Sequence, residues 1–75
     1  MTLDQLPVNT PAVIDNVTLS QEDTVRLMAL GLVPGKTVMV LRTTSSAIHC
    51  RISTTEFIVR RSIAQHIKLE KKHQW

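Results

Sequence analysis

Alternating apolar residues predict five short β-strands along the chain. In residues 47–52, apolar side chains alternate with His49 and Arg51, as in a strand with one buried face. Residues 37–43 are apolar on both faces, which indicates a central or wrapped strand. The expected strands cover residues 10–17, 37–43, 47–52, 56–60 and 67–69. Short strands at this spacing predict a small, strongly bent antiparallel barrel.

One helix is predicted at about residues 21–30. Ser20 is a good N-cap, and Asp23 three residues later gives the spacing of a capping box. Gly31 lies where a helix turns left-handed to end, and Pro34-Gly35 matches a type II turn. The segment therefore predicts a helix-to-strand corner.

The apolar residues of this helix do not form a single stripe. Leu27 and Leu30 share one side and, with Leu32, are expected in the core. The other side carries Val25, Met28 and Ala29. Either the C-terminal end of the helix is buried nearly all round, or it offers one apolar side to a partner.

Two shorter elements complete the expected fold. A lead-in segment at residues 2–7 anchors through Leu3 and Leu6. Before the last strand, Ser62 is expected to cap one short helical turn that runs through Ala64 and His66. Residues 71–75 read as a tail.

The composition fits a single small domain over residues 1–75. The lone Cys50 excludes an internal disulfide and favours a reducing compartment. The N-terminus shows no signal peptide, and no apolar run approaches the roughly 20 residues of a membrane span. These features predict a cytoplasmic protein.

Charge is divided unevenly along the sequence. Residues 1–25 carry four acidic and no basic side chains, whereas residues 26–75 carry all nine Lys and Arg. Interleaving of the two halves in the fold would cancel most of this asymmetry. Without interleaving, a basic face would meet an acidic partner.

Two segments carry a family resemblance that covers nearly the whole chain. The first is Arg26-Leu27-Met28-Ala29-Leu30-Gly31-Leu32-Val33-Pro34-Gly35 with the following strand, and the second is Ile58-Val59-Arg60-Arg61-Ser62-Ile63-Ala64-Gln65-His66-Ile67-Lys68-Leu69. The chain thereby resembles the FeoA family, small proteins associated with the ferrous iron transporter FeoB. The match departs from the family before the first strand, at Thr10-Pro11, and in the turn at Ser53-Thr54-Thr55, where relatives usually have glycine.

The resemblance implies a mainly β, Src-homology-3-like barrel without catalysis and with no required cofactor. It implies a regulatory role in ferrous iron uptake through the cytosolic GTP-binding region of FeoB, which would recruit the chain to the inner face of the membrane. A homo-oligomer is also compatible. The resemblance implies that a transition metal takes part in the uptake process. It does not imply that this chain binds the metal directly.

The expected contact residues lie on the helix and near the end of the fourth strand. The helix supplies Val25, Arg26, Met28 and Ala29, and the strand end supplies Arg60 and Arg61. Arg26 could instead cap carbonyls or pair with Asp23.

Metal binding is the first alternative function. The weak ligand candidates are His49, Cys50, His66 and His73. His49 and Cys50 point to opposite faces of a strand, and no Cys-x-x-Cys or His-x-x-x-His spacing exists. Cys50 is therefore expected to be a small buried apolar residue.

Nucleic-acid binding is the second alternative. A basic face could be lined by Arg42, Arg51, Arg60 and Arg61. Single-strand binding also uses aromatic stacking, and the only aromatic residues are Phe57, expected in the core, and Trp75. The sequence shows neither a nucleophile paired with a base nor a phosphate-binding loop, so no enzyme activity is expected.

Overall fold

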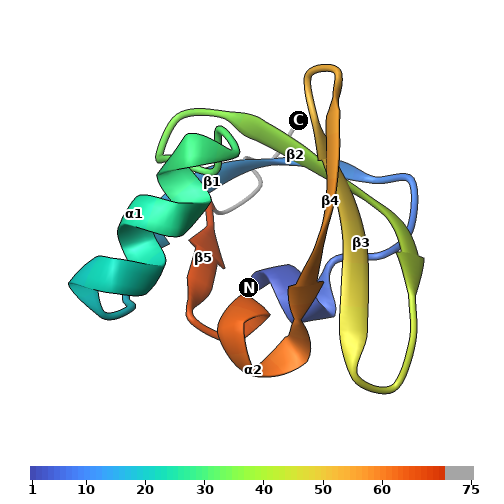
Figure 1. Ribbon diagram of the computed structural model, residues 1–75. Helices are drawn as coiled ribbons and strands as arrows, with labels where there is room; N and C mark the ends of the chain where they lie inside the picture. Colours follow the sequence, from blue (N-terminus) through green and yellow to red (C-terminus); the bar gives the residue numbers. More distant parts are fainter. Residues whose placement is uncertain (71–75) are drawn as a thin grey trace.

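A computed structural model describes residues 1–70 as a curled five-stranded antiparallel sheet with three short helical elements (Figure 1). The strands are β1 Pro11–Val17, β2 Thr37–Thr43, β3 Ala47–Ile52, β4 Thr55–Arg60 and β5 Ile67–Leu69. The sheet order is β4-β3-β2-β1-β5, so β2 is central, as its apolar pattern predicted. All five expected strands are confirmed, and β2, β3 and β5 have the predicted bounds.

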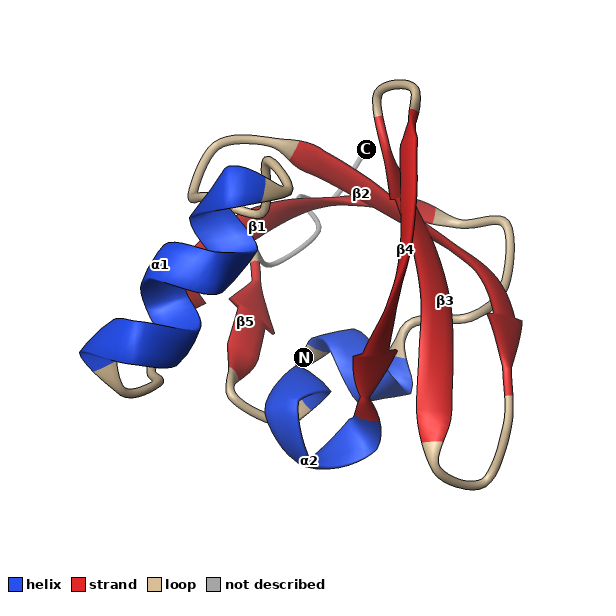
Figure 2. Cartoon of the chain, viewed as in Figure 1, coloured by secondary structure: helices blue, strands red, loops and turns tan. Residues whose placement is uncertain are grey.

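Irregular pairing bends the sheet into its barrel-like shape (Figure 2). The β1–β5 register shifts between Ile14 and Asn16, and the β2–β3 register shifts between Val40 and Arg42. Such bulges bend a strand and increase its twist. Because β1 pairs with β2 and β5, the acidic and basic halves of the sequence interleave in the fold.

The core of the described residues is entirely apolar. Alternate residues of β3 point inward, as the alternation predicted, and those of β4 do so too; the lead-in segment inserts Leu3 and Leu6. The buried side chains are Leu3, Leu6, Ile14, Leu27, Leu32, Val38, Val40, Ile48, Cys50, Ile52, Phe57, Val59, Ala64, Ile67 and Leu69. Within residues 1–70, no polar or charged residue is buried.

The helix α1 Gln21–Ala29 begins at the predicted residue and ends one residue earlier than predicted, with Leu30 as its C-cap. The Ser20 hydroxyl accepts a hydrogen bond from the Asp23 amide at 3.2 Å. At the other end, Gly31 has φ +90°, and the Leu32 amide donates to the Leu27 carbonyl at 3.0 Å. This is a Schellman motif, and it carries the chain directly into the type II turn at Pro34-Gly35.

Two local expectations are wrong. Leu30 is 36% exposed because it occupies the C-cap, and Leu32, returned by the turn at Gly31, takes the core position. Ser62 does not cap α2 Arg61–Ala64: the N-cap is Arg60, two residues earlier, and it makes no side-chain cap.

The N-terminal segment covers one edge of the sheet. It forms the short 3-10 helix η1 Leu3–Gln5, and Thr2 forms a bridge with Lys68 of β5. The Leu69 amide donates to the Met1 carbonyl at 2.9 Å. The β5 edge is therefore occupied by the chain's own backbone.

The hairpin between β3 and β4 contains a strained position. Ser53 has φ +57° in the two-residue turn that joins Ile52 to Thr55. A side chain in the left-handed region costs about 1–2 kcal/mol, and glycine does not carry this cost. This explains in physical terms why glycine suits this turn.

We therefore expect Ser53→Gly to raise the free energy of unfolding by about 0.5–1 kcal/mol, the relieved strain less the backbone entropy of glycine. Urea unfolding measures the change. Thr54→Gly is the matched control, because Thr54 does not have a positive φ, and it should lose about 0.5–1 kcal/mol. Equal losses in both variants would contradict this assignment.

Candidate protein-interaction surface

The outer face of α1, defined here as Val25, Met28 and Ala29, is exposed to solvent. Val25 is 57% exposed and Met28 is 53% exposed. Leu27 alone among the helix residues is buried, with Asp23 and Thr24 half-buried, and the apolar outer face of α1 is turned away from the barrel. Of the two arrangements left open by the sequence, the structure shows the one with an uncovered apolar side.

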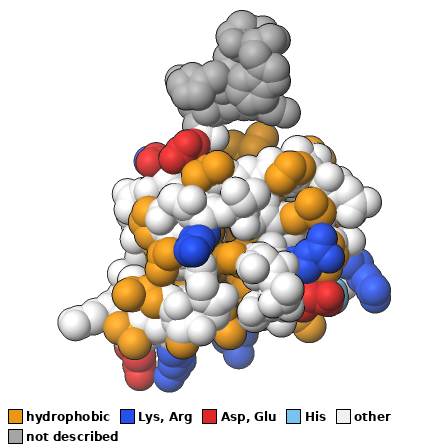
Figure 3. Space-filling view, turned by 90° about the horizontal axis from the view of Figure 1, so that it is seen from above, with side chains coloured by type: hydrophobic (Ala, Val, Ile, Leu, Met, Phe, Trp, Pro, Cys, Tyr) orange, Lys and Arg blue, Asp and Glu red, His pale blue; other side chains and the backbone are white. Residues whose placement is uncertain are grey.

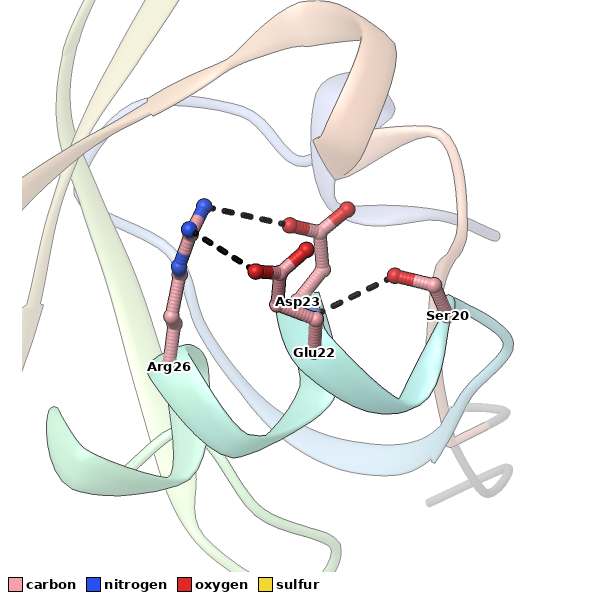
Figure 4. A network of polar contacts seen from close by, with 4 residues as sticks. All are labelled: Ser20, Glu22, Asp23 and Arg26. Atoms are coloured by element: carbon pink, nitrogen blue, oxygen red, sulfur yellow. Dashed lines mark hydrogen bonds and ion pairs between the residues drawn. The ribbon is translucent and has the colours of Figure 1, made fainter.

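Arg26 lies beside this face and pairs within its own helix (Figure 4). Its guanidinium is 3.3 Å from the Glu22 carboxylate and 3.7 Å from the Asp23 carboxylate. Exposed pairs of this kind contribute only about 0.3–0.5 kcal/mol, so Arg26 remains available to a partner.

The capping box at the start of α1 is half formed. The Ser20 hydroxyl accepts from the Asp23 amide, but within the described chain no hydrogen bond joins the Asp23 carboxylate to the Ser20 amide.

An open cleft of about 500 Å³ separates α1 from β4 and α2. Arg26 and Arg60 both line it, which brings together two expected contact residues that are far apart in sequence. Ile58 and Ile63 add apolar surface to the β4 side. The cleft thus combines charge and exposed apolar surface beside the middle of α1.

Arg61 has structural contacts that set it apart from Arg60. Its Nε donates to the Thr44 carbonyl at 2.8 Å, and its Nη1 donates to the Asp4 carbonyl at 3.4 Å. Arg61 therefore joins the β2–β3 turn and the N-terminal segment to α2. Arg60 is exposed and makes no ion pair within residues 1–70.

The metal-ligand candidates are dispersed. His49 Nε2 lies 3.0 Å from Glu56 Oε1 on the outer side of the sheet, whereas Cys50 is buried on the inner side. Burial raises the pKa of the Cys50 thiol from 9.0 to about 12, so it stays protonated, and metals bind the thiolate. His66 is exposed near the start of β5, and His73 lies outside the described residues. Across residues 1–70, no three His, Cys, Asp or Glu side chains group around a common point.

Basic side chains do not form a continuous patch on the face seen from above (Figure 3). Lys and Arg side chains there are interspersed with acidic and apolar ones. Phe57 is buried in the core, as expected, so it offers no stacking surface to a base. Trp75 lies outside the described residues.

Ile58 is an exposed apolar residue that was not expected at the surface. It is 70% exposed on β4, between the buried side chains of Phe57 and Val59. The alternation of a half-buried strand contains this signal, because residues on either side of an inward position point outward.

The sequence matches the FeoA domain family over residues 1–71. The chain belongs to the FeoA domain family. This membership makes it a non-catalytic accessory protein of ferrous iron transport. No helix among residues 1–70 has the length and apolar character to cross a bilayer. No curated protein sequence is significantly similar to the chain.

Three solved FeoA proteins share the fold over most of their length. FeoA from Chlorobium tepidum is 27% identical, with a TM-score of 0.86 and coverage of 100% of this chain and 80% of that one. FeoA from Stenotrophomonas maltophilia, solved with zinc, is 28% identical, with a TM-score of 0.81 and coverage of 93% and 89%. That protein is a prokaryotic SH3 domain protein proposed as a ferrous iron transport activating factor. An iron uptake regulatory FeoA protein shares the fold at 18% identity, with a TM-score of 0.85 and coverage of 92% and 93%.

The buried thiol makes stability depend on alkaline pH. Since the folded pKa lies above the unfolded value of 9.0, the unfolded state loses its proton first, and stability falls as pH rises from 9 towards 12. We expect wild type to lose up to about 1.4 kcal/mol per pH unit more than Cys50→Ala over this range. Urea unfolding at a series of pH values measures both slopes, and parallel slopes would exclude a buried protonated thiol.

Proposed function

We propose that this FeoA-family chain regulates a ferrous iron transporter by binding the cytosolic, GTP-binding region of FeoB. The observation that carries this proposal is the outer face of α1. A domain of this size with two large apolar side chains more than half exposed on one helix face presents a surface suited to a protein partner.

The arrangement of α1 supports this assignment. Its ends are fixed by the Ser20 cap and the Gly31 reversal, so the outer face is presented on a defined element. Arg26 and Arg60 supply positive charge beside it for an acidic rim on the partner. The chain would act on the cytoplasmic side of the membrane, where the GTP-binding region lies.

Regulation requires that the chain bind two states of the transporter with different affinities. The GDP-bound and GTP-bound forms of the FeoB region are the natural pair of states, because the nucleotide chemistry belongs to FeoB. A preference for one form shifts the transporter towards that form.

The test uses the double variant Val25→Ser/Met28→Ser and the soluble FeoB GTP-binding region loaded with GDP or a non-hydrolysable GTP analogue. Loss of two apolar contacts should weaken binding at least about tenfold, since each is worth about 1 kcal/mol or more. Stability should change little, because both side chains are exposed. Isothermal titration calorimetry measures the affinities.

Val8→Ser is the matched control, because Val8 is 44% exposed and lies outside α1. It should bind like wild type. Unchanged binding by the double variant would discard the outer face of α1, and absence of binding by wild type to either nucleotide form would discard the FeoB GTP-binding region as the partner.

A further inference from the structure

The strand β4 is the open edge of the sheet. The opposite edge, β5, is covered by Met1 and Thr2, but within residues 1–70 only β3 pairs with β4. The cleft of about 500 Å³ runs along Ile58 and Arg60, so no described element fills the space beside this edge. An uncovered edge strand is a template for another strand.

The phase of the β3–β4 ladder shows which backbone groups of β4 are free. The Arg61 amide donates to the Ser46 carbonyl at 3.0 Å, so that pair is hydrogen-bonded. Hydrogen-bonded and non-bonded pairs alternate along an antiparallel ladder. Every second residue back from Arg61 therefore bonds to β3, and the amides of Glu56, Ile58 and Arg60 point away from it. The carbonyls of Glu56 and Ile58 point away as well, whereas the Arg60 carbonyl, at the N-cap of α2, accepts the first hydrogen bond of that helix.

The side chains of the same three residues are exposed, as is that of Thr55 at the start of the strand. Ile58 is 70% exposed at the centre, with Glu56 and Arg60 exposed at equal distances on either side. The edge therefore presents a regular unit of acidic, apolar and basic residues, with three outward amides and the outward carbonyls of Glu56 and Ile58.

We propose that this edge pairs with the β4 edge of a second copy of the chain, in an antiparallel two-fold dimer centred on Ile58. In that register Ile58 faces its counterpart, Glu56 faces Arg60 of the second copy, and the reverse pair forms by symmetry. The central Ile58 pair exchanges two backbone hydrogen bonds, and each outer pair is joined by one, from the Arg60 amide to the Glu56 carbonyl of the other copy. Antiparallel two-fold pairing opposes positions equally distant from the centre, so opposite charges there make the edge complementary to itself.

The interface is small. It leaves out the outer face of α1 and shares only Arg60 with the surface proposed for FeoB. Three facing residues bury much less than the roughly 1,200 Å² of a standard stable interface, so the dimer is transient and forms at high protein concentration. Its formation does not depend on the proposed binding of FeoB.

Charge reversal tests the register with the full-length chain. Glu56→Arg alone and Arg60→Glu alone place like charges opposite each other, and each should weaken self-association about tenfold. The double variant Glu56→Arg/Arg60→Glu restores opposite charges and should associate like wild type. An equimolar mixture of the two single variants should form the heterodimer. Sedimentation equilibrium from about 50 µM to about 1 mM covers the range for a transient interface.

Arg42→Glu is the control, because it changes the same charge on β2, away from the β4 edge. It should leave association unchanged. Wild type that remains monomeric to about 1 mM, or single variants that associate like wild type, would overturn the proposal.

Ile58→Pro tests strand pairing itself. Proline removes an amide that points away from β3, so the ladder to β3 is kept while pairing with a second copy is lost. Circular dichroism checks the fold. If the variant does not fold, amide hydrogen exchange of wild type decides: protection of the Ile58 amide must rise with protein concentration, and constant protection would refute the dimer.

Discussion

The left-handed residue at Gly31 is the constraint on which the arrangement of this domain depends. It reverses the chain so that Leu32 returns against Leu27, and both side chains reach the core. A Cβ atom at Gly31 would lie 3.7 Å from Ile52, which is ordinary contact, so the requirement for glycine is one of backbone conformation and not of space. Four residues later, the Gly35 amide bonds to the Ile14 carbonyl at 2.8 Å and joins the corner to β1.

Turns and bulges complete the register of the barrel, because a shift by two residues would keep the same side chains in the core. No polar side chain is buried among residues 1–70, and apolar contacts specify which residues point inward more strongly than which residues face each other. Register comes instead from the two-residue turn at Ser53 and the irregularities in β1 and β2. The short hairpin between β3 and β4 requires the left-handed backbone conformation at Ser53, which is strained.

The strands and the helix were predictable because their signals are local. Alternation gave the bounds of β3, and the capping residue with Gly31 gave those of α1. Leu30 was predicted to be buried and is exposed. The direction of the chain after the Schellman turn decides which leucine is buried, and the local pattern does not contain that direction. The roles of Arg61 and the cleft depend on contacts between distant segments, such as Arg61 with Asp4, and no periodicity in the sequence encodes them.

The single buried anchor of α1 has a consequence for motion. Regions with little buried apolar surface open locally at lower free energy than the global unfolding of a domain. Leu27 is the only buried residue of α1 and also lines the cleft beside β4, so withdrawal of this side chain would release the helix and widen the cleft in one event. A ligand on the outer face of α1 and a ligand in the cleft would therefore change each other's affinity through Leu27. By thermodynamic reciprocity, the factor by which each changes the affinity of the other is the same.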